Sequence, residues 1–349
     1  MRKHIPSLNG LRAISILLVL LQHIDIKNLN GFLSGKCSLF VDGNLGVNVF
    51  FVISGFLITT LLLQEEEQAS NISLKGFYIK RAFRIFPVYY TLLFVYLTLQ
   101  LLNILDFTAG SWLTSLTYTK YLNWHSDWET AHLWSLSVEE QFYFIWPFVF
   151  RYAKKHRAKY AFAIIILVPL LRITHQVTQY QWMDFYTIFQ RVDAIMWGCI
   201  FALYHDKIMP VVQNILSKHK WAIVVPFAVL FALPLFDVIN QRMDLHMGLF
   251  IVPLGRTTGT IADIAIGFIM LISIYYRNVW FSLLNTRFME YIGKLSYSLY
   301  IWQQLFFSNK IGPIGKLPLN ILLIFVTANI SYYLIEKPFL KLRSKVLPG

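Results

Sequence analysis

The residues best suited to chemistry lie inside apolar stretches, beginning with Arg12 and His23 in LNGLRAISILLVLLQH. Ionisable side chains inside a membrane helix are costly and usually face a cavity or the interior of a helix bundle. In a helix, their separation of eleven residues amounts to about three turns, or about 16 Å along the axis, so both share one face. Each has an ordinary alternative, because an arginine can extend its charge to the membrane surface and a histidine can be a bonded structural residue. Their placement on one face favours a functional cavity.

A basic cluster, Lys80, Arg81 and Arg84, precedes the third apolar stretch in the sequence FYIKRAFRIFP. Arg81 and Arg84 are three residues apart and are therefore neighbours on one helix face. Two guanidinium groups so placed can bind a phosphate or diphosphate through paired hydrogen bonds. The alternative is that these residues only flank a membrane helix on its cytoplasmic side, as Lys and Arg commonly do.

Two carboxylates, Glu139 and Glu140, open the fourth apolar stretch in the sequence LWSLSVEEQFYFIWP. Ser137 and Glu140 fit the capping box of a helix start, which predicts a structural role for Glu140. Glu139 has no such explanation, and a carboxylate next to an apolar run needs a partner. We expect that partner to be His23, because a carboxylate bonded to one imidazole nitrogen fixes the tautomer and raises the basicity of the other nitrogen.

A further charged pair, Arg191 and Asp193, lies in the sequence FQRVDAIMWG. Side chains two residues apart do not face each other on a helix. Each is therefore expected to pair with another helix, mainly in a structural role.

The composition of the chain places these charges in a membrane protein. Of the 349 residues, 56% are apolar and only 14% are charged, whereas a soluble domain carries about 25% charged residues. The aromatic content of 17% excludes a disordered chain. The net charge of +13 could suggest nucleic-acid binding, but basic residues at the cytoplasmic ends of membrane helices explain it better. No metal site is expected, since no zinc-type spacing of Cys and His occurs.

The apolar stretches predict an all-α, polytopic transmembrane bundle of about ten spans, forming a single domain over residues 1–349. Lys and Arg gather in the connections that this division places inside, which predicts that both termini are cytoplasmic. Residues 64–80 are polar and then amphipathic, which predicts a helix along the inner membrane surface. The expected spans are 8–24, 46–63, 83–103, 134–150, 159–173, 188–204, 221–236, 257–276, 293–308 and 319–335.

Seven segments, spread over nearly the whole length, resemble the membrane-bound acyltransferase 3 family and follow its order. Members of this family move acyl groups, often acetyl, onto sugars and other extracytoplasmic acceptors. The resemblance therefore implies an acyltransferase. The segments are LNGLRAISILLVLLQH, GVNVFFVISGFLIT, KRAFRIFP, LWSLSVEEQFYFIWP, RVDAIMWG, GKLSYSLYIW and IEKPF.

The resemblance implies a role for each matching residue. His23 is similar to the essential histidine of the family, and Arg12 to the arginine that accompanies it. Arg81 and Arg84 are similar to the pair that engages the coenzyme A end of the donor, and Glu139 to the first glutamate of the family's helix motif.

Two further positions bear on the resemblance. Tyr143 is similar to the tyrosine of the same motif as Glu139, whereas Gln303 stands where many members have histidine. Many relatives also carry an esterase-like domain at the C-terminus. Because this sequence ends shortly after IEKPF, we expect the standalone transmembrane form, and any second transfer step would need a partner protein.

These patterns predict an integral-membrane O-acyltransferase with His23 as general base, oriented by Glu139 and accompanied by Arg12. It would move an acyl group, acetyl by resemblance, from cytoplasmic acyl-CoA held by Lys80, Arg81 and Arg84 to a hydroxyl of an extracytoplasmic or lipid-linked carbohydrate. Histidine can also be a nucleophile, so an acyl-histidine intermediate stays open. The alternative is a proton-coupled transporter or exporter, because intramembrane His, Glu and Arg also form proton relays. We expect a multi-pass protein in contact with lipids of the bacterial inner membrane.

Overall fold

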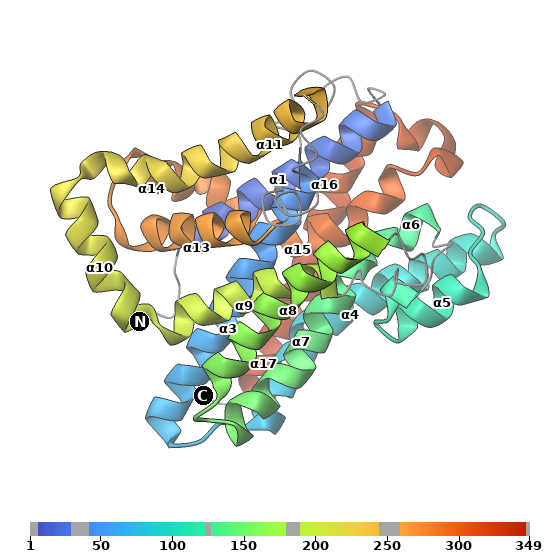
Figure 1. Ribbon diagram of the computed structural model, residues 1–349. Coiled ribbons are helices and arrows are strands. Elements are labelled where there is room, and N and C mark those ends of the chain that lie inside the picture. The colour runs from blue at the N-terminus through green and yellow to red at the C-terminus, as the bar shows by residue number, and fades with distance from the viewer. Residues whose placement is uncertain (1–5, 29–41, 123–126, 179–188, 244–258, 347–349) are drawn as a thin grey trace.

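The chain is all-helical in its computed structural model, which describes residues 6–28, 42–122, 127–178, 189–243 and 259–346 (Figure 1). No strand occurs within these ranges. The all-α fold expected from the apolar stretches is therefore confirmed for the described part of the chain.

Five helices surround the centre of the molecule and carry most of the residues singled out above. Together they contribute most of a continuous apolar core. These helices are α1 (Pro6–Asn28), α3 (Gly43–Ala69), α4 (Leu74–Leu101), α7 (Leu133–Tyr152) and α15 (Arg287–Phe306).

The remaining helices pack around this centre or cap its ends (Figure 1). One group consists of α8 (Arg157–Thr178), α9 (Phe189–Leu203), α10 (His205–Lys218), η3 (Lys220–Val224), α11 (Val225–Met243), α13 (Thr260–Tyr275) and α14 (Val279–Leu284). The connection from α4 to α7 contains α5 (Ala109–Leu116), η1 (Lys120–Leu122) and α6 (Trp128–Ala131). After α15 follow η5 (Asn309–Gly315), α16 (Leu319–Ser331), the π-turn η6 (Tyr332–Glu336) and α17 (Lys337–Val346).

Glycine allows α3 and α9 to approach closely. A Cβ atom at Gly55 of α3 would collide with the Ile195 carbonyl of α9, and one at Gly198 of α9 would collide with the Val52 carbonyl of α3. Such contacts between small residues are typical of packed membrane helices. They fix the helix that carries Ser54 against the α8–α9 side of the molecule.

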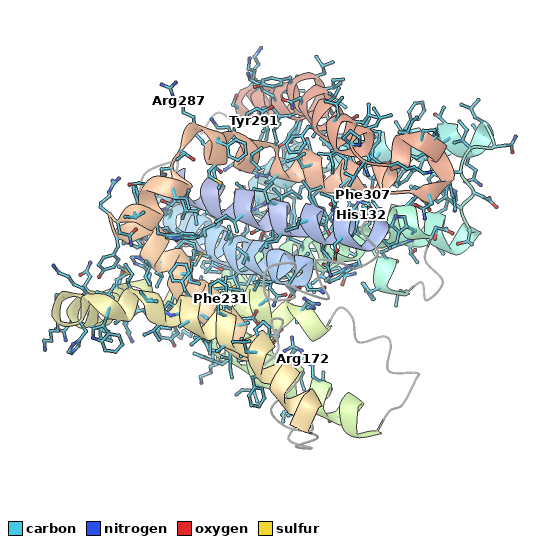
Figure 2. All side chains as sticks on the ribbon, turned by 90° about the horizontal axis from the view of Figure 1, so that it is seen from above. His132, Arg172, Phe231, Arg287, Tyr291 and Phe307 are labelled. Carbon is cyan, nitrogen blue, oxygen red and sulfur yellow. The ribbon has the colours of Figure 1, made fainter. Side chains whose placement is uncertain are left out.

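Large apolar side chains cover much of the outer surface. Leu101, Phe144, Val279 and Leu334 are all more than 60% exposed, and side chains rich in carbon project from the outward faces of the helices (Figure 2). Such a surface suits a lipid environment, where backbone polar groups form their hydrogen bonds inside the helices and apolar side chains face the lipid.

Each of the ten expected spans overlaps a helix or two successive helical elements, the latter at 221–236 (η3 and α11) and 319–335 (α16 and η6). Within the described residues, four helices are long and apolar enough to cross a membrane: those at 7–25, 43–69, 74–101 and 319–346. The pair α9 and α10, bent by 82°, would make a fifth. The structure thus supports a helical membrane protein, and the count of ten spans stays a prediction.

The prediction of one helix along the membrane surface at residues 64–80 is wrong. α3 continues to Ala69, because the QEEEQ segment consists of good helix formers. α4 then begins at Leu74, where the Ser73 hydroxyl accepts a hydrogen bond from the Gly76 amide. Lys80, Arg81 and Arg84 therefore belong to the second and third turns of the long helix α4, and Pro87 lies inside that helix rather than at its start.

Candidate active site

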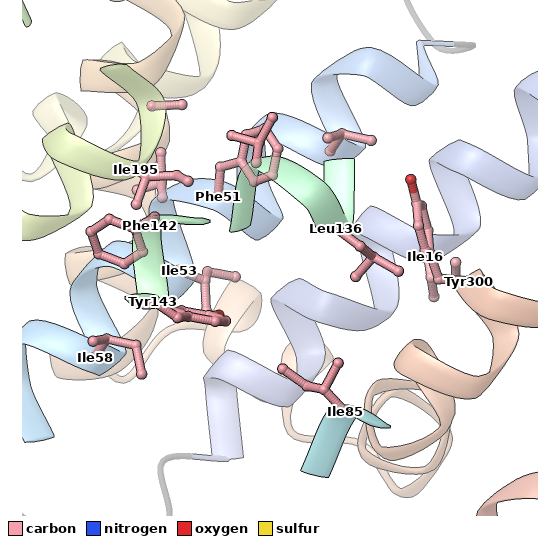
Figure 3. Packing of buried hydrophobic residues seen from close by; sticks show 14 of the residues in the cluster. Ile16, Phe51, Ile53, Ile58, Ile85, Leu136, Phe142, Tyr143, Ile195 and Tyr300 are labelled. Carbon is pink, nitrogen blue, oxygen red and sulfur yellow. The ribbon is translucent and has the colours of Figure 1, made fainter. Parts of the chain in front are cut away.

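A cavity with an empty volume of about 670 Å³ lies between the five central helices. In Figure 3, Ile85 of α4, Leu136 and Tyr143 of α7, and Tyr300 of α15 lie around this region. Its walls combine aromatic and apolar side chains with charged ones. The lining residues are Arg12, Val47, Phe50, Phe51, Ser54, Arg81, Arg84, Ile85, Ser135, Leu136, Glu139, Tyr143, Ser296, Tyr297 and Tyr300.

Three arginines line this cavity without an ion-pair partner among the residues that the structure describes. Arg81 and Arg84 reach it from adjacent turns of α4, and Arg12 reaches it from α1. Among the described residues, no carboxylate lies within 4.0 Å of any of the three guanidinium groups. A partly buried arginine is normally paired, because an uncompensated charge away from water is costly. The excess positive charge of the cavity is therefore suited to an anionic ligand. Because Arg81 and Arg84 both line it, the prediction that they share one helix face is confirmed.

The carboxylate of Glu139 lies in the same cavity, where one of its oxygens accepts hydrogen bonds from the Ser54 and Tyr143 hydroxyls. The ring of Tyr143 in turn lies 4.2 Å from the guanidinium carbon of Arg81, at the distance of a cation–π contact. Glu139 is thus linked through Tyr143 to the basic pair. The sequence prediction that Glu139 pairs with His23 is wrong in this structure, because the nearer hydroxyls of Ser54 and Tyr143 occupy the carboxylate.

His23 has a different partner. Its Nδ1 lies 2.9 Å from the Val19 carbonyl oxygen, one turn earlier in α1. Because a carbonyl can only accept, Nδ1 carries a proton, and Nε2 is the nitrogen that acts as the base whenever the ring is neutral. The ring stacks on Phe307 and meets Trp128 edge-on, each at 5.8 Å between centroids. A backbone carbonyl thus does what was expected of Glu139: it fixes the tautomer a general base requires.

His23 does not line the cavity, although α1 carries both His23 and Arg12. Tyr300 closes the cavity wall on α15. Its hydroxyl lies 2.6 Å from Ser135 Oγ and donates to the His132 carbonyl at 2.9 Å. Of the pair predicted to share a polar stripe, only Arg12 reaches the cavity.

His132 is a buried residue that sequence reasoning missed. It lies between α6 and α7, and its Nε2 donates to the Ile301 carbonyl at 3.1 Å. Burial, with a smaller contribution from His23, lowers the pKa of His132 to about 3, so the ring is neutral. Figure 2 marks His132 and Phe307, the residue that stacks on His23. The histidine in the sequence AHLWSLS could have been considered for its position directly before the fourth apolar stretch.

Two other predicted residues are placed differently from expectation. Lys80 is exposed and is not among the cavity-lining residues. The prediction of a capping box formed by Ser137 and Glu140 is wrong. α7 already begins at Leu133, and the Ser137 hydroxyl donates to the Leu133 carbonyl at 3.0 Å. Glu140 therefore lies inside the helix, with Oε1 buried and without a hydrogen-bond partner among the described residues.

Gln303, the position of the family's histidine, lies on α15 between Tyr300 and Phe307 and is fully buried. Neither its amide nitrogen nor its amide oxygen has a hydrogen-bond partner within the described ranges. The structure gives no further account of this substitution.

Arg191 and Asp193 pair with other helices, as predicted. Arg191 donates to the Asn48 side chain of α3 at 2.8 Å, and Asp193 accepts from Arg172 of α8 at 2.7 Å. Asn48 also donates to Asp263 of α13 at 2.8 Å, which joins α3, α8, α9 and α13 in one buried polar network. This network lies on the α8–α9 side of α3, and none of its residues lines the cavity.

Comparison with known proteins identifies the family. The profile described as an acyltransferase domain, that of acyltransferase 3, matches residues 5–335. The O-acetyltransferase OatA of Staphylococcus aureus strain NCTC 8325 is 29% identical in an alignment of 372 positions that covers 97% of this chain and 58% of OatA. OatA of Staphylococcus aureus strain COL gives the same values. This chain thus spans a little over half the length of these relatives, and no solved structure is significantly similar to it. Since the profile covers almost all of the sequence, the chain belongs to the membrane-bound acyltransferase 3 family.

Proposed function

We propose that this protein is an O-acyltransferase that moves an acetyl group from cytoplasmic acetyl-CoA to a hydroxyl of an extracytoplasmic or lipid-linked carbohydrate. The observation that carries the proposal is the cavity lined by Arg12, Arg81 and Arg84, none of which has a carboxylate within 4.0 Å in the described part of the chain. The names of the relatives, which are O-acetyltransferases, support acetyl as the transferred group.

Coenzyme A is an anionic ligand of the required kind, because its nucleotide end carries a diphosphate and a further phosphate. Arginine binds phosphate oxygens through charge-assisted, often bidentate, hydrogen bonds. Arg81 and Arg84, one turn apart near the start of α4, would hold these phosphates. The apolar and aromatic walls formed by Phe50, Ile85 and others would then receive the pantetheine arm.

The transfer step would use His23 as general base. Nε2 would take the proton of the acceptor hydroxyl while the hydroxyl oxygen attacks the thioester carbonyl carbon. The carbon–sulfur bond then breaks, and the thiolate of coenzyme A leaves and takes up a proton. Acid–base catalysis by a positioned group typically contributes about 10²–10⁴-fold. Attack by His23 itself, through an acyl-histidine, is the variant.

In this mechanism the thioester must pass the cavity wall to reach His23. Tyr300 and Ser135 form that wall and are bonded to each other at 2.6 Å. Rotation of the Tyr300 side chain would open the cavity towards the outer part of α1. Glu139 would act inside the cavity by positioning Tyr143 and, through it, Arg81, rather than by orienting His23.

The proposal includes the topology that this reaction requires. About ten spans with both termini in the cytoplasm would place the start of α4 on the side where acyl-CoA is made. Its support is that every expected span overlaps one helix or two successive helical elements and that the basic residues gather in the connections assigned to the cytoplasm. The protein would then be a multi-pass protein of the bacterial inner membrane.

The experiment for the acceptor is mass spectrometry of surface glycans and lipid-linked saccharides from cells with and without the gene. The proposal predicts acetyl esters that disappear with the gene and return with the wild-type gene but not with His23→Ala. A complete set of acetyl esters in the deletion strain would contradict it. Thermal stabilisation of the purified protein by coenzyme A separates the enzyme from the transporter alternative, which predicts stabilisation by the transported molecule alone.

A further inference from the structure

The C-terminal segment packs against the helix that carries the basic pair. Phe339 of α17 contacts Phe83 of α4, with 6.2 Å between ring centroids. Phe83 directly precedes Arg84, so this contact brings α17 to the part of α4 that holds the proposed donor phosphates. Figure 1 shows α17 at the same end of the molecule as the α3–α4 and α7–α8 connections.

One face of this segment carries Glu336, Phe339 and Arg343. At 100° per residue these positions fall within about 60° of one another, and Glu336 and Arg343 are about two turns apart. Since Phe339 contacts α4, the whole face is directed towards that helix.

The two charged residues of this face both lie close enough to Arg84 to interact with it electrostatically. Glu336 is buried, accepts a hydrogen bond from the Ser298 hydroxyl at 3.0 Å, and interacts electrostatically with Arg84 and Arg12. Arg343, two turns further along, is partly buried and interacts with Arg84 and Arg81. Within the described segments, no carboxylate lies within 4.0 Å of Arg343.

Arg343, Arg81 and Arg84 therefore form a group of like charges from two helices that are far apart in the sequence. Like charges repel one another, and an anion between them offsets that repulsion. Glu336 is held by Ser298 and makes no ion pair within 4.0 Å with these arginines in the described structure, so it offsets their charge only in part and an anionic ligand would offset the rest.

We infer that α17 completes the donor site, with Arg343 as a third arginine for the phosphate groups of coenzyme A. This inference rests on the proposed function, because it takes coenzyme A to be the donor. Glu336 anchors the segment at its inner end, and Arg343 extends the basic surface of Arg81 and Arg84 towards the end of α17. The nucleotide phosphates, which pantetheine lacks, are the part of the donor that Arg343 recognises.

The test compares Arg343→Ala with Lys345→Ala in the full-length purified protein. Lys345 is an exposed lysine on the same helix, about 200° away from Arg343, and therefore points away from α4. Isothermal titration measures the affinity of each variant for coenzyme A and for pantetheine.

Arg343→Ala is expected to weaken coenzyme A binding about tenfold, as for the loss of one charged hydrogen bond, and to leave pantetheine binding within twofold. Lys345→Ala is expected to match the wild type for both ligands. Equal coenzyme A affinities for Arg343→Ala and the wild type would overturn this inference and leave the proposed function intact. Absence of coenzyme A binding by the wild type would instead overturn the proposed donor, and this inference with it.

Discussion

The guanidinium carbon of Arg81 lies 4.2 Å from the centre of the Tyr143 ring, and the hydroxyl of the same tyrosine donates a hydrogen bond to Glu139. One side chain of α7 thus holds a cation on its face and a carboxylate at its tip. This arrangement keeps Glu139 from forming a direct ion pair with Arg81. The arginine is fixed in place and its charge remains available to a ligand.

The Tyr143 ring should therefore contribute to donor binding more than its hydroxyl does. Tyr143→Leu removes the surface against which Arg81 packs, and we expect it to weaken coenzyme A binding about three- to tenfold, the size of one cation–π contact. Tyr143→Phe keeps the ring but loses the hydrogen bond with which Glu139 positions it, so its loss of affinity should be smaller than that of Tyr143→Leu. Titration calorimetry on both variants checks this, and equal losses for the two would refute the role of the ring.

The basic pair should supply most of the donor affinity. Arg81→Ala combined with Arg84→Ala removes two charged contacts, and we expect coenzyme A affinity to fall about 100-fold or more. Lys80→Ala is the matched control, because Lys80 is the adjacent basic residue of α4 but is exposed and outside the cavity. It should change the affinity less than threefold in the same titration. A double variant that binds like the wild type would remove the assigned donor site.

A buried ion pair should stabilise the junction of α3, α7 and α8. Arg157 makes two hydrogen bonds with Glu66, at 2.7 and 2.8 Å, and its guanidinium carbon lies 3.6 Å from the centre of the Phe150 ring. Arg157→Ala removes the charged hydrogen bonds to Glu66, which is partly exposed and keeps Lys154 as a partner, and should lower the free energy of unfolding by about 1.5–3 kcal/mol. Lys154→Ala removes an exposed partner of the same carboxylate and should cost less than about 1 kcal/mol.

Denaturant unfolding of both variants measures these differences, and coenzyme A affinity should stay unchanged because neither residue lines the cavity. Equal stabilities of Arg157→Ala and Lys154→Ala would show that the buried pair is not the stabilising element.

Lys120 should make stability depend on pH. It lies in η1, outside the expected spans, and burial of its ammonium group lowers the pKa to about 8. The unfolded chain, with an ordinary lysine pKa of about 10.4, binds the proton more tightly than the folded protein does. Stability therefore rises as the pH increases from about 8 towards 10.4, and the cost of the buried charge is fully present below pH 8.

Lys120→Met removes this cost, so it should raise the melting temperature at pH 7 and raise it less at pH 10. Melting curves of the variant and the wild type at both pH values measure the difference. A gain of the same size at the two pH values would mean that the titration of Lys120 does not contribute.

Much of the fold could be predicted from the sequence because long apolar stretches have few alternatives to a helix. The face shared by Arg81 and Arg84 also followed from spacing alone. The cavity position of Arg12 and Glu139 was anticipated on the ground that ionisable groups in apolar helices face the interior. Arg191 and Asp193 found partners on other helices for the same local reason: their spacing prevents a contact between them.

The partners of individual side chains could not be predicted, because they depend on how the helices pack. Ser54 is uncharged and stands out by no spacing in the sequence, yet its hydroxyl bonds to Glu139. The Val19 carbonyl took the place expected for Glu139 beside His23. Local capping signals also misled: Ser137 and Glu140 match a capping box, but the helix starts a turn earlier, at Leu133.

The most direct test of the account is acetyl transfer in inverted inner-membrane vesicles, which expose the cytoplasmic side to labelled acetyl-CoA and contain the native acceptor. Vesicles with the wild-type protein should incorporate label into carbohydrate. Vesicles with His23→Ala should incorporate less than about 1% of that amount, as for the loss of a general base, although the purified variant binds coenzyme A with wild-type affinity. Transfer by His23→Ala at the wild-type rate would contradict the account.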